Sequence, residues 1–195
     1  MMTKDELLGI WNYYLSLEND LANTSRYIEP MGQENVHSFE FAKLIILACT
    51  EVESAFKILC QLITGHQVSG DIGTYKATIL GKYPKIITAT VSVRRLGKDI
   101  APFADWNNRK LNWWESYQHV KHNRGSFFGD ATYINAVQAI SALYILTFYV
   151  AKSSNLCFPD HEATYLSSNY AHPGLLCAPD KELPDFEEVS DETTI

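Results

Sequence analysis

Residues 134–150 are apolar on almost every side of the helix that their spacing predicts. A helix at the surface of a soluble protein has one apolar face, so a helix that is apolar all round is expected to be surrounded by others. The least polar stretch, residues 139–151, is about 13 residues long, whereas a membrane-spanning helix needs about 20. We therefore expect a buried central helix and no membrane anchor.

Two further long helices are expected in the first third of the chain, where apolar residues recur at intervals of three and four. Thr3 and Glu6 form the pattern of a capping box at the start of a helix over residues 3–27. Ser38 is the expected N-cap of the next helix, whose apolar face continues until Gly65.

The middle of the chain is less regular. Asp71 is a suitable N-cap for a short helix through residue 80, which must end before Pro84. Residues 86–103 contain β-branched side chains and a turn at Gly97, so we expect an irregular excursion or a small hairpin.

The fourth long helix is expected to start with Asn107 or Asn108 as its N-cap and to end near Gly125. Asp130 is the expected N-cap of the last helix. The predicted fold class is therefore all-α: a bundle of four long helices with one short extra helix, the small excursion and an acidic C-terminal tail.

Charge is unevenly distributed between the two predicted parts, a helical bundle over residues 1–152 and an extended loop and tail over 153–195. The whole chain has a formal net charge of -7. Residues 180–195 contain seven acidic side chains and one lysine, whereas residues 76–124 contain ten basic and three acidic ones. The bulk charge does not indicate general nucleic-acid binding, but the basic segment does suit an anionic ligand.

The segment WWESYQHVKHNR, residues 113–124, is the densest cluster of chemically versatile side chains. On a helical wheel it has two faces: Trp113, Tyr117, Val120 and Arg124 lie on one, and Glu115, His119 and His122 lie on the other. One interpretation is structural, with the aromatic rings in the core and the basic residues at the negative end of the helix dipole. The other is a site where a histidine moves a proton and Arg124 with Lys121 binds a phosphate.

The segment YQHVKHNR, followed by an Ala-rich apolar helix, resembles uncharacterised bacterial members of the HEPN-like group (higher eukaryotes and prokaryotes nucleotide-binding). The run ACTEVESAFKILC is similar to the polar-marked second helix of the same proteins. The resemblance covers roughly residues 5–152. It implies a cytoplasmic homodimer that binds RNA or a nucleotide, in active members a metal-independent ribonuclease of a toxin or phage-defence system with an antitoxin or other protein partner.

On this resemblance we assign His122 as the general base, Arg124 as the phosphate clamp and His119 as a lesser catalytic residue. The candidate substrate-binding residues are Lys121, Tyr117, Lys57 and Glu53, although the last two are also spaced as a simple helical ion pair. Active members have an Arg followed by a His several residues later. No Arg in this chain is followed by His after four to six intervening residues, so the alternative is a non-catalytic protein-interaction bundle.

A homodimer is also expected from the aromatic residues Trp113, Trp114 and Tyr117, which cover more of the helix than one bundle contact needs. The N-terminal sequence MMTKDELLGIW has charges where a signal peptide needs an apolar run, and ordinary cysteine usage suits a reducing compartment. These features favour a cytoplasmic location.

We predict no cofactor, because the chain lacks a Gly-rich phosphate loop, a nucleophile elbow and paired-carboxylate spacing. Two weaker metal hypotheses are a tetrahedral zinc set and a three-ligand set on one helix. The first consists of Cys157, His161, His172 and Cys177, and the second of Glu115, His119 and His122. Scattered loop residues are the simpler interpretation of the first set, and a disulfide between its cysteines is the least favoured one.

The acidic tail is expected to shield the basic segment, because opposite charges on one chain attract at moderate salt. Truncation after Pro179 should therefore raise the affinity for nucleic acid, measured by fluorescence anisotropy with a labelled RNA. An unchanged affinity would contradict this prediction.

Overall fold

The structure is a computed structural model that describes residues 2–156, 176–177 and 184–185. Its helices are α1 (Lys4–Thr24), α2 (Phe39–Thr64), α3 (Ile72–Lys82), α4 (Asn112–Asn123) and α5 (Tyr133–Ser153). Short 3-10 turns are η1 (Pro84–Thr88), η2 (Arg94–Leu96) and η3 (Phe128–Asp130), and the strands are β1 (Val91–Val93), β2 (Lys98–Ile100) and β3 (Leu176–Cys177). The predicted all-α fold class is confirmed.

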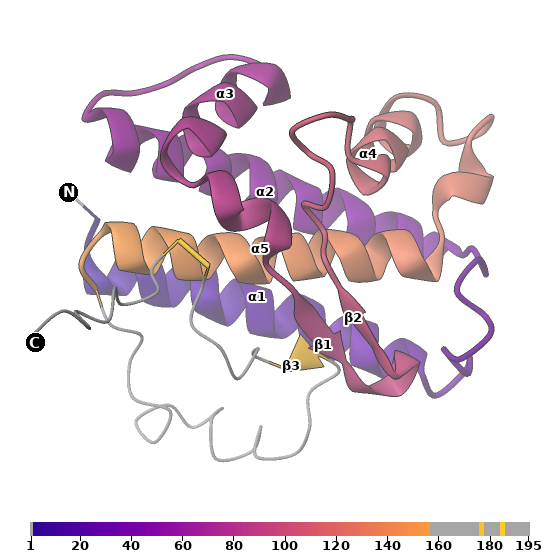
Figure 1. The fold of residues 1–195 in the computed structure, drawn as a ribbon. Helices are drawn as coiled ribbons and strands as arrows, with labels where there is room; N and C mark the ends of the chain where they lie inside the picture. Colours follow the sequence, from indigo (N-terminus) through magenta and orange to yellow (C-terminus); the bar gives the residue numbers. More distant parts are fainter. Residues whose placement is uncertain (1, 157–175, 178–183, 186–195) are drawn as a thin grey trace, which may run out of the picture.

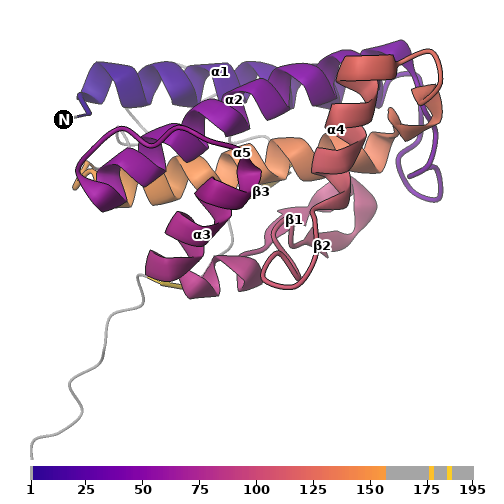
Figure 2. The ribbon, with the colours of Figure 1, turned by 90° about the horizontal axis from the view of Figure 1, so that it is seen from above.

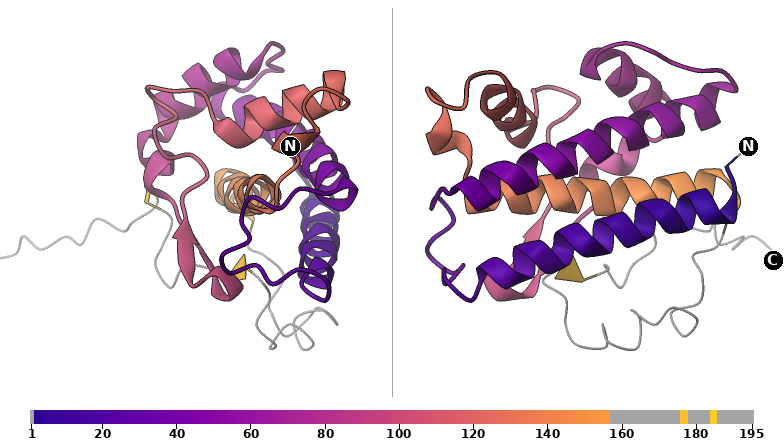
Figure 3. Two further views of the ribbon diagram at one scale, coloured as in Figure 1. Left: turned by 90° about the vertical axis from the view of Figure 1, so that its right-hand side faces the viewer. Right: turned by 180° about the vertical axis from the view of Figure 1, so that it is seen from behind.

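Helix α5 lies at the centre of the bundle (Figure 1). It packs most extensively against α2 and also contacts α1 and α4. The left view of Figure 3 looks along α5 and shows these helices and the hairpin arranged around it. The predicted position of this segment is therefore confirmed, and its apolar residues on all sides each have a neighbouring element to contact.

Local sequence explains where the first two long helices start and where α2 stops, whereas α1 ends at Thr24, before the expected residue 27. The Thr3 side chain accepts from the backbone N–H of Glu6, and the Glu6 carboxylate accepts from the backbone N–H of Thr3 at 2.7 Å. Ser38 caps α2, and Gly65 ends it with a positive φ of 78°, a conformation that favours glycine. The expected capping box, N-cap and stop are all confirmed.

The middle segment forms a short helix and then a small sheet. Asp71 caps α3 as expected, and residues 91–100 form a hairpin with Gly97 at a φ of 60°. Strand β3, from the chain beyond the bundle, pairs antiparallel with β1, so the strand order is β2-β1-β3. The sequence predicted the hairpin but not the third strand.

Helix α4 begins later than expected, and the predicted cap at Asn107 or Asn108 is wrong. It starts at Asn112, with no side-chain cap at Leu111. The chain turns at Asp105, whose φ of 59° is left-handed, and the next residue, Trp106, is buried with its ring stacked on Phe56 at 5.4 Å. Because Trp106 must enter the core, residues 105–109 form turns and α4 has 12 residues.

Helix α5 is capped by Thr132, whose side chain accepts from the backbone N–H of Asn135, so the prediction of Asp130 as the cap is also wrong. Asp130 lies in η3, and its carboxylate is paired with His119 instead. Figure 2 shows α4 lying across α2 and α5, near the start of α5, which brings these residues together.

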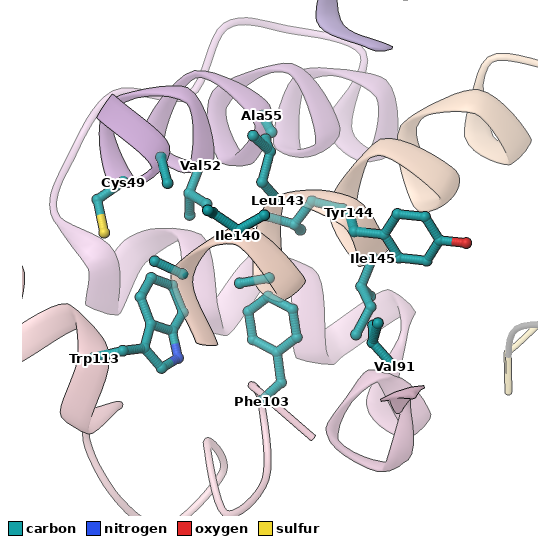
Figure 4. Close-up of a cluster of buried hydrophobic side chains, with 14 of the residues drawn as sticks. Cys49, Val52, Ala55, Val91, Phe103, Trp113, Ile140, Leu143, Tyr144 and Ile145 are labelled. Carbon is teal, nitrogen blue, oxygen red and sulfur yellow. The ribbon is translucent and has the colours of Figure 1, made fainter. Parts of the chain in front are cut away.

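The core is formed where α2 faces α5. Figure 4 shows Cys49, Val52 and Ala55 of α2 against Ile140 and Leu143 of α5. Cys49 and Cys60 are buried free cysteines, as the apolar pattern suggested, and burial raises the pKa of Cys60 to about 11. These thiols therefore serve as core side chains.

Among the described residues, α5 is the one helix that is long and apolar enough to cross a membrane. In this fold 78% of its most apolar window is buried inside the protein. Such burial is typical of the core helix of a soluble domain.

Leu143 is completely buried between α5 and α2, so Leu143→Ala should lower the free energy of unfolding by ~2 to 5 kcal/mol, through lost burial and the cavity that remains. Urea denaturation measures this change. Met31→Ala, at an exposed position, should change the free energy by less than about 0.5 kcal/mol. Equal effects of the two substitutions would contradict the assigned core.

Candidate functional site

His119 and Asp130 form a close pair between α4 and η3. The Nδ1 atom of His119 lies 2.6 Å from Oδ2 of Asp130, and both side chains are half-exposed. An ionised carboxylate only accepts hydrogen bonds, so Nδ1 is the donor and the neutral ring has its lone pair on Nε2. Within the described residues no hydrogen bond reaches that Nε2 atom. The arrangement is that of a general base oriented by a carboxylate.

The pair is supported by contacts on both sides. The Phe127 ring stacks on the His119 ring, with centroids 4.3 Å apart. The side-chain amide of Asn135, at the start of α5, donates to the backbone carbonyl of Asp130 and to the Ser116 hydroxyl, each at 2.9 Å. The amide therefore ties η3 to both α4 and α5, which limits the movement of Asp130.

The four predicted substrate-binding residues also come together, across the α2–α4 contact. The Lys121 ammonium donates to the Tyr117 hydroxyl at 3.0 Å, and this bond raises the pKa of Lys121. The charge of Glu53 raises that pKa further and the charge of Lys57 lowers it, so both groups lie near the ammonium. Lys57 itself pairs with Glu53 at 2.9 Å. The predicted ion pair is therefore present, and the four candidate side chains lie near one another.

A cavity of about 480 Å³ lies between the start of α3, α2 and α4. Its lining includes His119, the aromatic rings of Trp114 and Tyr75, and the carboxylates of Glu53 and Glu115. The second carboxylate pairs with a lysine of the lining, Lys110, at 3.5 Å. His119, which is half-exposed, therefore borders a cavity whose two named carboxylates are each paired with a lysine.

Arg124 and His122 differ in their surroundings. The Arg124 guanidinium lies 5.7 Å from the ring centroid of Phe39, the first residue of α2. His122 is exposed in the last turn of α4, and no hydrogen bond or ion pair joins it to another described residue. The three predicted catalytic residues are therefore held differently: His119 by a carboxylate, Arg124 by a ring, and His122 by neither.

The aromatic residues of α4 are buried within the chain. Trp113, Trp114 and Tyr117 belong to the core, and the Trp113 indole donates to the carbonyl of Pro102 at 2.8 Å. The turns before α4 and helix α2 cover these rings, so the rings do not exceed the needs of one bundle contact as the sequence suggested. A homodimer thus stays a prediction based on the family resemblance.

No three His, Cys, Asp or Glu side chains in the described part of the chain are close enough to hold a metal ion. The hypothesis that Glu115, His119 and His122 form a three-ligand site is therefore wrong, since Asp130 orients His119 and Lys110 pairs with Glu115. The other metal hypothesis concerns Cys157, His161, His172 and Cys177. Their side chains lie outside the described residues.

One acidic residue of the tail, Asp185, is described. Its carboxylate accepts from the backbone N–H of Lys85 and from the Tyr149 hydroxyl, both at 3.1 Å. This contact places a tail carboxylate on the basic segment, at the end of α5 that is distant from His119. The effect of the tail on nucleic-acid binding stays a prediction.

Sequence reasoning missed the partners that give the candidate site its geometry. Asp130 was assigned as a helix cap, and Asn135, Phe39 and Phe127 had no assigned role. Because hydrogen bonds between side chains on different elements leave no periodic pattern, the sequence offered only the polar residues themselves.

Comparisons with protein-family models, with curated proteins and with solved structures find no match to this chain. The candidate site therefore has to be interpreted from its own residues.

Asn135→Ala should lower the free energy of unfolding by ~1 to 3 kcal/mol, because Ser116 and the Asp130 carbonyl lose a partner in a half-buried position. Thermal or urea unfolding measures the loss. Asn12→Ala, at an exposed position of α1, is the matched control and should be nearly silent. A silent Asn135→Ala would show that the amide does not hold η3 in place.

Proposed function

We propose that this protein is a HEPN-like RNA- or nucleotide-binding protein whose α4 surface acts as a metal-independent ribonuclease with His119 as the general base. The observation that supports it most is the 2.6 Å pair between His119 Nδ1 and Asp130. The pairing leaves Nε2 unprotonated in the neutral ring, and the half-exposed position lets a substrate approach. This proposal exchanges the roles that the sequence suggested for His119 and His122.

The chemistry needs only a base, a proton donor and positive charge. In the proposed step Nε2 of His119 takes the proton of a ribose 2′-hydroxyl, and the hydroxyl oxygen attacks the adjacent phosphorus. The bond from phosphorus to the 5′-oxygen breaks, the leaving oxygen takes a proton from water, and a 2′,3′-cyclic phosphate remains. Arg124, just after the last turn of α4, supplies positive charge for the phosphate, because Lys121 is already hydrogen-bonded to Tyr117.

The second candidate is a binding protein without catalysis. The order of the basic residues favours it, because the Arg-then-His spacing of active HEPN-like members is absent. Both candidate functions use the α4 surface, and a test for RNA cleavage distinguishes the ribonuclease from the binding protein.

The test uses purified protein and a mixed RNA pool in EDTA, with cleavage followed by gel electrophoresis. His119→Ala should lower the cleavage rate by ~10² to 10⁴, the usual contribution of general-base catalysis, and leave RNA binding nearly unchanged. Asp130→Asn should also slow cleavage, because the amide no longer orients the ring as a carboxylate does. Arg124→Lys should weaken both binding and cleavage, since lysine cannot make a two-pronged contact.

His122→Ala is the matched control, because it removes an exposed imidazole from the same helix. A large loss for His122→Ala with none for His119→Ala would return the role of the base to His122. Binding without cleavage in the wild type would support the second candidate. In that case the logarithm of the binding constant for a single strand should still fall with the logarithm of salt at ~0.7 per contacted phosphate. Absence of both binding and cleavage would contradict both candidates.

A further inference from the structure

Phe39 is a strongly exposed aromatic residue beside the candidate site. It exposes 70% of its surface, although it begins the apolar helix α2. Its ring centroid lies 4.6 Å from that of Phe128, and His37 contacts Phe128 edge-on at 5.1 Å. The Arg124 guanidinium lies 5.7 Å from the Phe39 centroid. These four side chains, named here the aromatic platform, form one continuous surface with the Phe39 ring mostly in water.

The platform is held in position by backbone hydrogen bonds between two loops. The N–H of Ser38 donates to the carbonyl of Ala131 at 3.2 Å, and the N–H of Tyr133 donates to the carbonyl of Val36 at 2.9 Å. His37 and Thr132 form an isolated antiparallel bridge between these bonds. Because these hydrogen bonds already hold the two loops together, little conformational entropy is lost when a ligand contacts the rings.

The platform is linked along the chain to a ring that stacks on the candidate general base. Phe127 precedes Phe128 in the chain, exposes 40% of its surface, and stacks on His119 at 4.3 Å. A ligand on Phe39 therefore lies beside Arg124, which the proposed cleavage uses.

The charge around the platform suits an anionic ligand. Glu40, next to Phe39, is paired with Lys43, and Asp130 is paired with His119. Arg124 has no ion pair with another described residue, so its positive charge is available. An exposed ring beside an available guanidinium is the combination that binds an unpaired base and its phosphate.

From these contacts we infer that Phe39 and Arg124 form a stacking subsite for one unpaired nucleobase, and that the subsite selects single-stranded over double-stranded RNA. The inference rests on the proposed function and adds the substrate class and the residue that selects it. In a duplex the faces of the bases are covered by their neighbours, so only an unpaired base can lie on the Phe39 ring.

The experiment measures, by fluorescence anisotropy, the binding of one labelled RNA as a single strand and as a duplex. Phe39→Ala should weaken binding of the single strand about 5- to 100-fold and change duplex binding little, because stacking is lost only with an unpaired base. Phe39→Trp should retain the affinity, since the larger ring also stacks, whereas Phe39→Leu should resemble Phe39→Ala.

Tyr13→Ala is the matched control. Tyr13 is exposed by 37%, and its pKa is raised first by partial burial and then by the nearby charges of Glu51 and Asp20, so two carboxylates and no described cation act on its ring. Its removal should leave binding unchanged. Circular dichroism and light scattering on each variant report the helix content and the mass.

The outcomes separate this inference from the proposed function. If the wild type binds no RNA, both fail. If the wild type binds RNA and Phe39→Ala binds the single strand equally well, the stacking subsite is overturned and the proposed function stands. If Phe39→Ala converts a dimer into a monomer, the ring covers a second copy of the chain, and the subsite is likewise overturned.

Discussion

The packing of α5 against α2 is the interaction on which the rest of this structure depends. Helix α5 is apolar on all sides, and each large side chain that it buries stabilises the fold by ~1.5 to 3 kcal/mol relative to an exposed one. This burial requires a neighbour on every side, which α1, α2, α4 and the hairpin provide. The positions of the other elements follow from their shared need to cover this helix.

The candidate site follows from the same packing. Helix α4 lies across α2 and α5 because Trp113 and Tyr117 enter the core, and its opposite face, with His119, is left half-exposed. The start of α5 then brings Asn135 and Asp130 next to that face. The positions of His119, Asp130 and Asn135 at the surface are thus a consequence of the burial of apolar side chains beneath them.

Two kinds of polar cluster border α4, and they differ in chemistry. The cluster of Tyr117, Lys121, Lys57 and Glu53 is balanced, since each ammonium has a hydrogen-bond partner. The surroundings of His119 and Arg124 are less balanced: no described residue forms a hydrogen bond with the Nε2 atom of His119, and the Arg124 guanidinium lies over an exposed ring. His119 and Arg124 can therefore form new hydrogen bonds with a ligand without first breaking hydrogen bonds between described residues of the protein.

The sequence by itself determined the all-α fold class, the central position of α5, the start of α1 and both ends of α2. These features depend on periodicity and on caps such as Ser38 and Gly65, which act within a few residues of one another. It also supplied Lys121, Tyr117, Lys57 and Glu53 as candidates, and the structure brings these side chains near one another. Only the tertiary structure decided where α4 starts, because the burial of Trp106 overrides the capping preference of Asn107 and Asn108. It likewise decided that Asp130 pairs with His119 and that Phe39 meets Arg124, since these contacts join residues on different elements and depend on how α4 lies across the bundle.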